Sequence, residues 1–141
     1  MNTKPKSGYE TTAGVSWFPR ILDKIRLHHH GELHPDFHAN LGLPVGADGF
    51  CCRFLRVEYA ALRTRVLAGG TDEEILAWCY EHGRRLDTYD LVIWNAFVKK
   101  FGWRDKATPV LERLKAQSGL AHRDDLVTML EYMEVDEGRK P

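Results

Sequence analysis

Hydrophobic residues return at every third or fourth position over most of the chain, which is the spacing of an amphipathic α-helix. The clearest stripes are Phe18, Ile21, Leu22 and Ile25; Ile75, Trp78 and Cys79; Leu91, Trp94, Val98 and Phe101; and Met129, Leu130 and Met133. No long segment alternates apolar and polar residues as a half-buried strand does. The pattern predicts an all-α protein, a single-domain bundle of five or six main helices joined by short loops.

Capping residues mark the ends of several predicted helices. Ser16 can cap the first helix, with Pro19 in its first turn, and Gly31 can end it. Thr71 and Glu74 have the spacing of a capping box, in which each side chain accepts a hydrogen bond from the other residue's backbone N–H. These signals place helix boundaries where the hydrophobic stripes begin and end.

Polar segments flank the predicted bundle. Residues 1–14 are expected to form a flexible N-terminal arm, residues 15–135 the helical domain, and residues 136–141 a polar C-terminal tail. Glycine and proline crowd residues 31–49, so this part is predicted to be turn-rich, with one short helical piece at 35–41.

Composition narrows the classes of function. The 141 residues are 43% hydrophobic and 28% charged, with 20 basic and 20 acidic side chains. The zero net charge argues against a dedicated nucleic-acid or anionic-membrane binder, because such a protein needs a basic field. No apolar run is long enough to span a membrane or to act as a secretory signal. We therefore expect a cytoplasmic protein that binds neither membrane nor nucleic acid.

The histidines suggest a metal site that the local sequence disfavours. His30, His34 and His38 are spaced by four, so a continuous helix would align three imidazoles, which are good ligands for zinc, nickel or copper. Gly31 and Pro35 interrupt that helix. We therefore expect loop histidines at a helix end and no resident cofactor, with Zn or Ni bound at most adventitiously by His34 and His38.

The polar side of the first helix supplies the candidate site. Arg20, Asp23 and Lys24 crowd this side, and a solvated face with mutually compensated charges is one interpretation. Trp17 and Leu27 project large apolar groups beside these charges. Because apolar groups next to Arg and Lys can recognise a partner, we take these five residues as the candidate partner or ligand surface.

The cysteines and tryptophans could be reactive or bind a ligand, but the sequence predicts that they are buried structural residues. Cys51 and Cys52 open a helix, where the helix dipole could lower a thiol pKa, but their apolar neighbours favour buried packing. Trp78, Trp94 and Trp103 are expected in the core, where an aromatic ring buries a large area.

Two stretches of the chain carry a family resemblance. The run GVSWFPRILDKIR, followed by GEL, resembles the start of the bacterial domain-of-unknown-function family 5069, and FLRVEYAALRTRVLAGGTDEEILAWCYEHG is similar to its middle. The matching residues of the first stretch are Gly14, Pro19, Arg20, Asp23, Lys24 and Arg26. The resemblance implies a small helical bacterial protein without an established activity, and the histidine triplet departs from the family pattern.

No familiar catalytic signature accompanies this framework: the sequence contains no GxGxxG, P-loop or GxSxG motif. We therefore favour a non-enzymatic helical module that binds a protein partner or itself as a homodimer. The alternative is a small-molecule or metal-binding protein, or an enzyme, with a His-rich cleft near residues 28–38.

Overall fold

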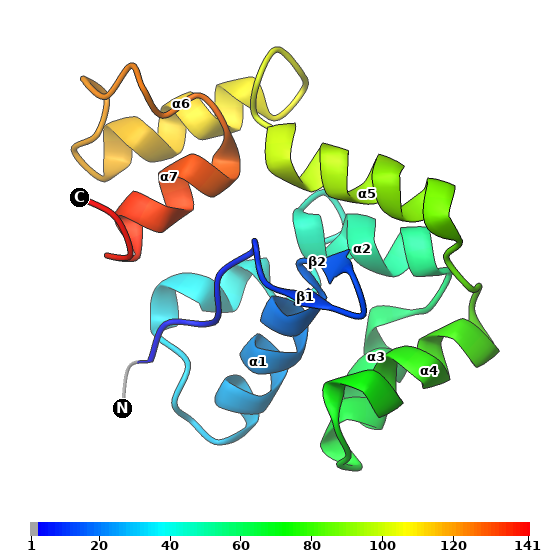
Figure 1. The fold of residues 1–141 in the computed structure, drawn as a ribbon. Helices are drawn as coiled ribbons and strands as arrows, with labels where there is room; N and C mark the ends of the chain where they lie inside the picture. The colour runs from blue at the N-terminus through cyan, green and yellow to red at the C-terminus, as the bar shows by residue number, and fades with distance from the viewer. Residues whose placement is uncertain (1–2) are drawn as a thin grey trace. The chain divides into compact units, whose positions relative to one another are not determined.

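Helices dominate the computed structural model, which describes residues 3–141 (Figure 1). The helices are α1 (Phe18–His29), the 3-10 helix η1 (Pro35–Asn40), α2 (Ala47–Leu55), α3 (Tyr59–Leu67), α4 (Asp72–His82), α5 (Thr88–Lys100), α6 (Thr108–Gln117) and α7 (Met129–Asp136). Two short strands, β1 (Thr11–Thr12) and β2 (Val15–Ser16), pair in antiparallel fashion. The predicted all-α fold is confirmed, with small extra elements beside the main helices. No helix within residues 3–141 has the length and apolar character needed to cross a membrane.

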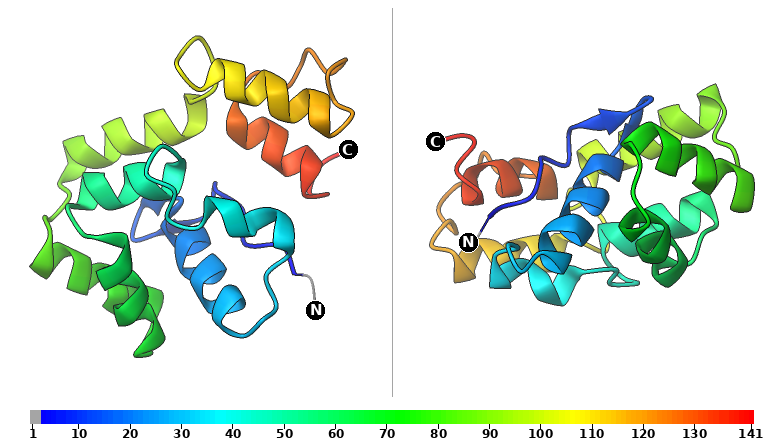
Figure 2. Two further views of the ribbon diagram at one scale, coloured as in Figure 1. Left: turned by 180° about the vertical axis from the view of Figure 1, so that it is seen from behind. Right: turned by 90° about the horizontal axis from the view of Figure 1, so that it is seen from below.

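The chain divides into two compact units between Trp94 and Asn95, within α5. In the first unit, α1 packs against α3 and α3 against α4, as the view from behind shows (Figure 2). The stripe predicted for the first helix forms the centre of this unit, because Phe18, Ile21 and Leu22 are completely buried.

Helix α1 begins differently from the sequence prediction. Ser16 belongs to β2, and the N-cap is Trp17, which makes no side-chain capping bond. Trp17 has a left-handed backbone with φ of 74°, a conformation that costs a large L-residue free energy. The Trp17 N–H donates to the carbonyls of Gly8 and Glu10, at 3.1 and 3.3 Å. The start of α1 is thus fixed by tertiary contacts instead of a local cap, while Pro19 does occupy the first turn.

Residues 3–14 carry defined structure where the sequence predicts a flexible arm; residues 1 and 2 of that arm lie outside the described residues. Thr3 forms a parallel bridge with Leu33, with backbone bonds of 2.6 and 3.0 Å to Glu32 and His34. The β1–β2 hairpin turns at Ala13 and Gly14, whose positive φ angles suit a tight turn. A hydropathy pattern does not report backbone pairing of this kind, which is why the polar composition of these residues predicts a flexible arm.

The end of α4 lies directly against the end of α2. Arg84 donates from its backbone N–H to the carbonyl of Leu55 and from its Nε to the carbonyl of Phe54, at 2.9 and 2.6 Å. A Cβ at Gly83 would overlap the Leu55 carbonyl oxygen, so only glycine permits this approach. The capping box that begins α4, Thr71 with Glu74, is present as predicted.

The second unit contains the end of α5 together with α6 and α7, which lie side by side (Figure 1). Leu111 and Leu130 are buried between these elements. The Met129 N–H at the start of α7 donates to the Phe101 carbonyl at 2.9 Å. A second capping box, Thr128 with Glu131, begins α7.

Candidate functional site

The residues predicted as a surface on α1 are mostly inside the protein. Trp17, Arg20 and Lys24 are 2%, 2% and 3% exposed, whereas Asp23 and Leu27 are half-buried. The prediction of an exposed charged face is therefore wrong for the first three residues. Segments distant in the sequence cover this side of α1, and hydrophobic periodicity cannot reveal them.

A buried ion pair lies at the centre of this region. The Lys24 ammonium is 2.7 Å from Oδ2 of Asp48, and both side chains are at most 4% exposed. Asp48 also accepts hydrogen bonds from the Trp17 indole N–H at 2.8 Å and from the Gly42 backbone N–H at 3.1 Å. Asp48 stands in the first turn of α2, where the helix dipole favours a negative charge. The pair therefore joins α1, α2 and the loop between them.

Arg20 extends this network to the N-terminal segment. Its Nη1 donates to the Lys6 carbonyl at 2.9 Å, and its guanidinium carbon lies 5.1 Å from the Trp17 ring centre and 5.6 Å from that of Phe37. Asp23, one turn from Arg20, accepts from the Lys6 N–H at 2.8 Å. These contacts engage the charges of α1 inside the fold, which is why they do not form an open binding surface.

The histidines of the predicted metal site are each engaged locally. His30 Nδ1 lies 2.7 Å from the Arg26 carbonyl, and His38 Nε2 lies 3.0 Å from the Leu33 carbonyl. His34 is the N-cap of η1 and accepts from the Asp36 N–H at 3.1 Å. Across residues 3–141, no three His, Cys, Asp or Glu side chains are grouped so that they could hold a metal ion. The structure thus does not assemble His30, His34 and His38 into one site.

The three cysteines are buried, as the sequence predicts for Cys51 and Cys52. Burial raises the pKa of the Cys51 thiol well above its usual range, and the nearby thiol of Cys52 and carboxylate of Asp48 add to the shift. Burial likewise raises the pKa of Cys52 and that of Cys79 to about 12. All three are neutral thiols at physiological pH, so none is activated as a nucleophile.

These thiols predict a loss of stability in alkali. Since the folded pKa of Cys52 and of Cys79 is about 12 and the ordinary value is 9.0, unfolding releases protons between these limits. The free energy of unfolding should therefore fall as pH rises above about 9. Urea titrations at about pH 8, 9 and 10 measure this slope. A C52A/C79A variant should show a flatter slope, and an unchanged slope in that variant would contradict the assignment.

The tryptophans divide between core and surface. Trp94 is 3% exposed and donates from its indole to the Ser16 carbonyl at 2.8 Å, as a core residue should. Trp78 is half-buried and stacks on His82. Trp103 is 49% exposed, so its predicted burial is wrong. It follows the glycine that ends the helical stripe, and the Arg104 guanidinium lies 5.2 Å from its ring centre.

Within residues 3–141, three of the four most exposed large apolar side chains lie on α5. Tyr89, Val92 and Ile93 are 79%, 64% and 61% exposed. Their spacing of three and four residues places them on one side of the helix, and we call them the α5 apolar face. Sequence reasoning missed this face because the same helix also carries the buried stripe of Trp94 and Val98. The available signal was the uninterrupted run 91–94, in which two apolar residues fall outside that stripe.

Charged side chains stand at both ends of α5. At the N-terminal end, the Asp87 carboxylate accepts from the Asp90 N–H at 2.9 Å and the Asp90 carboxylate accepts from the Asp87 N–H at 3.0 Å. The second of these bonds lowers the pKa of Asp90, and its ion pair with Arg84 lowers it further. Lys99 and Lys100 occupy the last turn and are exposed. The carboxylates at the start of α5 and the lysines in its last turn match the helix dipole, and the Arg84 guanidinium also lies at the N-terminal end, paired with Asp90.

Comparison with known protein families shows which family the chain belongs to. The profile of the family described as a domain of unknown function (DUF5069) matches residues 2–139. The chain therefore belongs to this family, and the resemblance found in the sequence is confirmed. No curated protein and no solved structure matches the chain.

Proposed function

We propose that the protein is a non-enzymatic interaction module that binds a second copy of itself through the α5 apolar face. The observation that supports this proposal is the exposure of Tyr89, Val92 and Ile93 on one side of a single helix. Apolar surface in contact with water costs about 25 cal/mol per Å². A contiguous cluster on a regular helix is typical of a docking surface, whereas scattered exposed apolar residues are ordinary.

The charge distribution of α5 favours a second copy as the occupant. Asp87 is exposed immediately before α5, and Lys100 is exposed in its last turn. In an antiparallel pair of α5 helices, Asp87 of each copy lies toward Lys100 of the other. An isologous contact of this kind closes a two-fold dimer, the commonest symmetry of soluble oligomers.

The size of the face sets the expected affinity. Stable interfaces bury about 1,200–2,000 Å² in total, and three side chains from each copy supply only part of that area. We therefore expect a reversible dimer with a dissociation constant of about 10–100 µM. Sedimentation velocity from about 5 to 500 µM should show the weight-average mass rising from that of a 16.2 kDa monomer toward twice that value.

Charge substitutions test whether α5 makes the contact. A V92E/I93E variant should raise the dissociation constant at least about tenfold, because it buries carboxylates in the interface. Lys100→Glu should raise the dissociation constant about threefold, because it places a carboxylate toward Asp87 of the second copy. Val45→Glu is the matched control, since Val45 is 78% exposed in the loop before α2, outside the α5 apolar face, and its substitution should leave association unchanged. A monomer at 500 µM, or a dimer unaffected by V92E/I93E, would refute the proposal.

We also propose that the protein acts in the reducing cytoplasm. Cys51, Cys52 and Cys79 are free thiols packed in the interior. Free buried thiols are typical of proteins in reducing compartments, whereas secreted domains of this size often rely on disulfides.

A further inference from the structure

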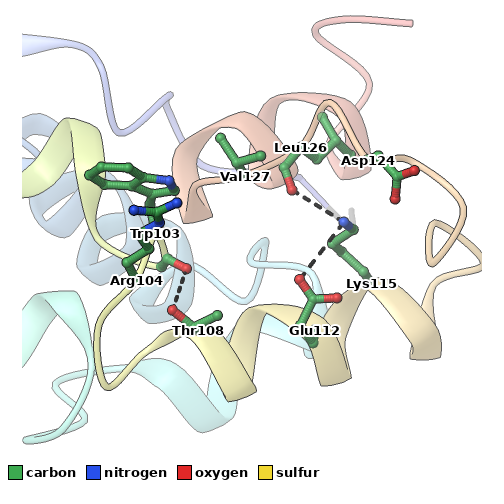
Figure 3. A pocket seen from close by; sticks show the side chains of 9 residues that line it. Trp103, Arg104, Thr108, Glu112, Lys115, Asp124, Leu126 and Val127 are labelled. Atoms are coloured by element: carbon green, nitrogen blue, oxygen red, sulfur yellow. Dashed lines mark hydrogen bonds and ion pairs between the residues drawn. The ribbon is translucent and has the colours of Figure 1, made fainter.

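A pocket of about 290 Å³ lies within the second unit, between the loop after α5, helix α6 and the segment before α7 (Figure 3). Its walls include Trp103, Arg104, Glu112, Lys115, Asp124 and Val127. The pocket shares no residue with the α5 apolar face.

The ammonium of Lys115 is the principal polar group of the pocket. Lys115 is 3% exposed, and its Nζ donates to the Leu126 carbonyl at 3.2 Å (Figure 3). The Glu112 carboxylate is 4.0 Å away, beyond hydrogen-bond length, and its side chain is 61% exposed. An ammonium group has three N–H donors, and a buried charge is costly unless it is well paired. Lys115 can therefore donate to a further anionic group in the pocket.

One side of the pocket is aromatic and apolar. Trp103 and Val127 are 49% and 44% exposed, which leaves their surfaces available to a ligand. Arg104 has a left-handed backbone with φ of 51°, and its guanidinium lies over the Trp103 ring. Non-glycine residues adopt this conformation at a cost, and such residues cluster at binding sites. The indole therefore offers a flat apolar surface beside a cation.

The signs of the charged groups define the ligand class. Arg104 and Lys115 are cationic, and Glu112 and Asp124 are anionic, so the lining has both signs in equal number. A ligand with one sign of charge would be attracted by two of these groups and repelled by the other two, whereas a ligand with both signs can place each charge beside groups of opposite sign. We infer that the pocket binds a small zwitterion, namely a free amino acid with a large apolar side chain. Its carboxylate bonds to Lys115, its ammonium lies beside Glu112, and its side chain contacts Trp103.

Nuclear magnetic resonance titration of the full chain tests this assignment with three related probes. L-Phenylalanine carries both charges, N-acetyl-L-phenylalanine carries only the carboxylate, and phenethylamine carries only the ammonium. We expect saturable shifts of the pocket amides with L-phenylalanine, with a dissociation constant of about 1 mM. The two singly charged probes should bind at least about fivefold more weakly. Equal binding of either one, or no saturable shift up to about 20 mM L-phenylalanine, would overturn the inference.

Variants connect the binding to the named side chains. Trp103→Ala and Glu112→Gln alter exposed groups and should preserve the fold, while each weakens L-phenylalanine binding at least about threefold. Lys115→Met removes the ammonium, and should abolish saturable binding. Glu81→Gln, an exposed change on α4, is the matched control and should bind as the unmodified chain does. If Lys115→Met does not fold, the other two variants decide, and unchanged binding in both would refute the site.

Discussion

Replacing Asp48 with Ala is expected to lower the free energy of unfolding by about 3–5 kcal/mol. The change leaves the Lys24 ammonium buried without its carboxylate, which lies 2.7 Å away in the native protein. The Trp17 indole N–H and the Gly42 backbone N–H also lose their acceptor. Urea unfolding followed by circular dichroism measures the loss, provided that the dependence on denaturant is unchanged.

Two further variants separate the buried charge from the loss of packing. Replacing both partners, Lys24→Met with Asp48→Leu, removes the charge itself and should destabilise the protein less than Asp48→Ala alone. Asp125→Ala breaks an ion pair with Arg123 at the surface and should leave the unfolding midpoint nearly unchanged. If Asp48→Ala cost less than about 1 kcal/mol, the carboxylate would not organise the region as described.

Gly83→Ala should be comparably damaging, with an expected loss of about 3 kcal/mol or more. The added methyl group would overlap the carbonyl oxygen of Leu55 and crowd that of Arg56, and backbone atoms cannot turn aside as a long side chain can. The ends of α2 and α4 would have to separate. Thermal unfolding of the variant measures the effect.

Gly119→Ala is the control for Gly83→Ala. Gly119 has a positive φ of 75° and no atom within 4 Å of an added Cβ, so its substitution introduces backbone strain without a steric clash. A loss of about 1 kcal/mol is expected there. Equal losses at Gly83 and Gly119 would show that strain, and not the approach of α4 to α2, explains the requirement for glycine.

The helical framework could be predicted because local signals determine it. The stripe of Phe18, Ile21 and Leu22 does face the core, and the Thr71–Glu74 capping box does begin a helix. Periodicity and capping depend on residues within a few positions of one another, so they are visible in a single sequence. The family resemblance was confirmed for the same reason, since its motifs are short and contiguous.

The candidate site was predicted poorly because it depends on distant contacts. Lys24 and Arg20 look like solvent-exposed charges until Asp48 and the Lys6 carbonyl are placed beside them. Conversely, Val92 adjoins a buried stripe in sequence but remains in contact with water. A hydropathy pattern shows which residues are apolar, whereas the packing of whole helices decides which of them are covered.

The positions of the tryptophans allow the unfolding of the two units to be followed separately by fluorescence. Of the four tryptophans, only Trp103 belongs to residues 95–141, and it is half exposed where Trp17 and Trp94 are enclosed. In a variant whose only tryptophan is Trp103, tryptophan fluorescence would follow the unfolding of the second unit. In a variant that lacks only Trp103, it would follow the unfolding of the first unit. Comparing their melting curves would show whether the units lose their structure in one cooperative event or in two.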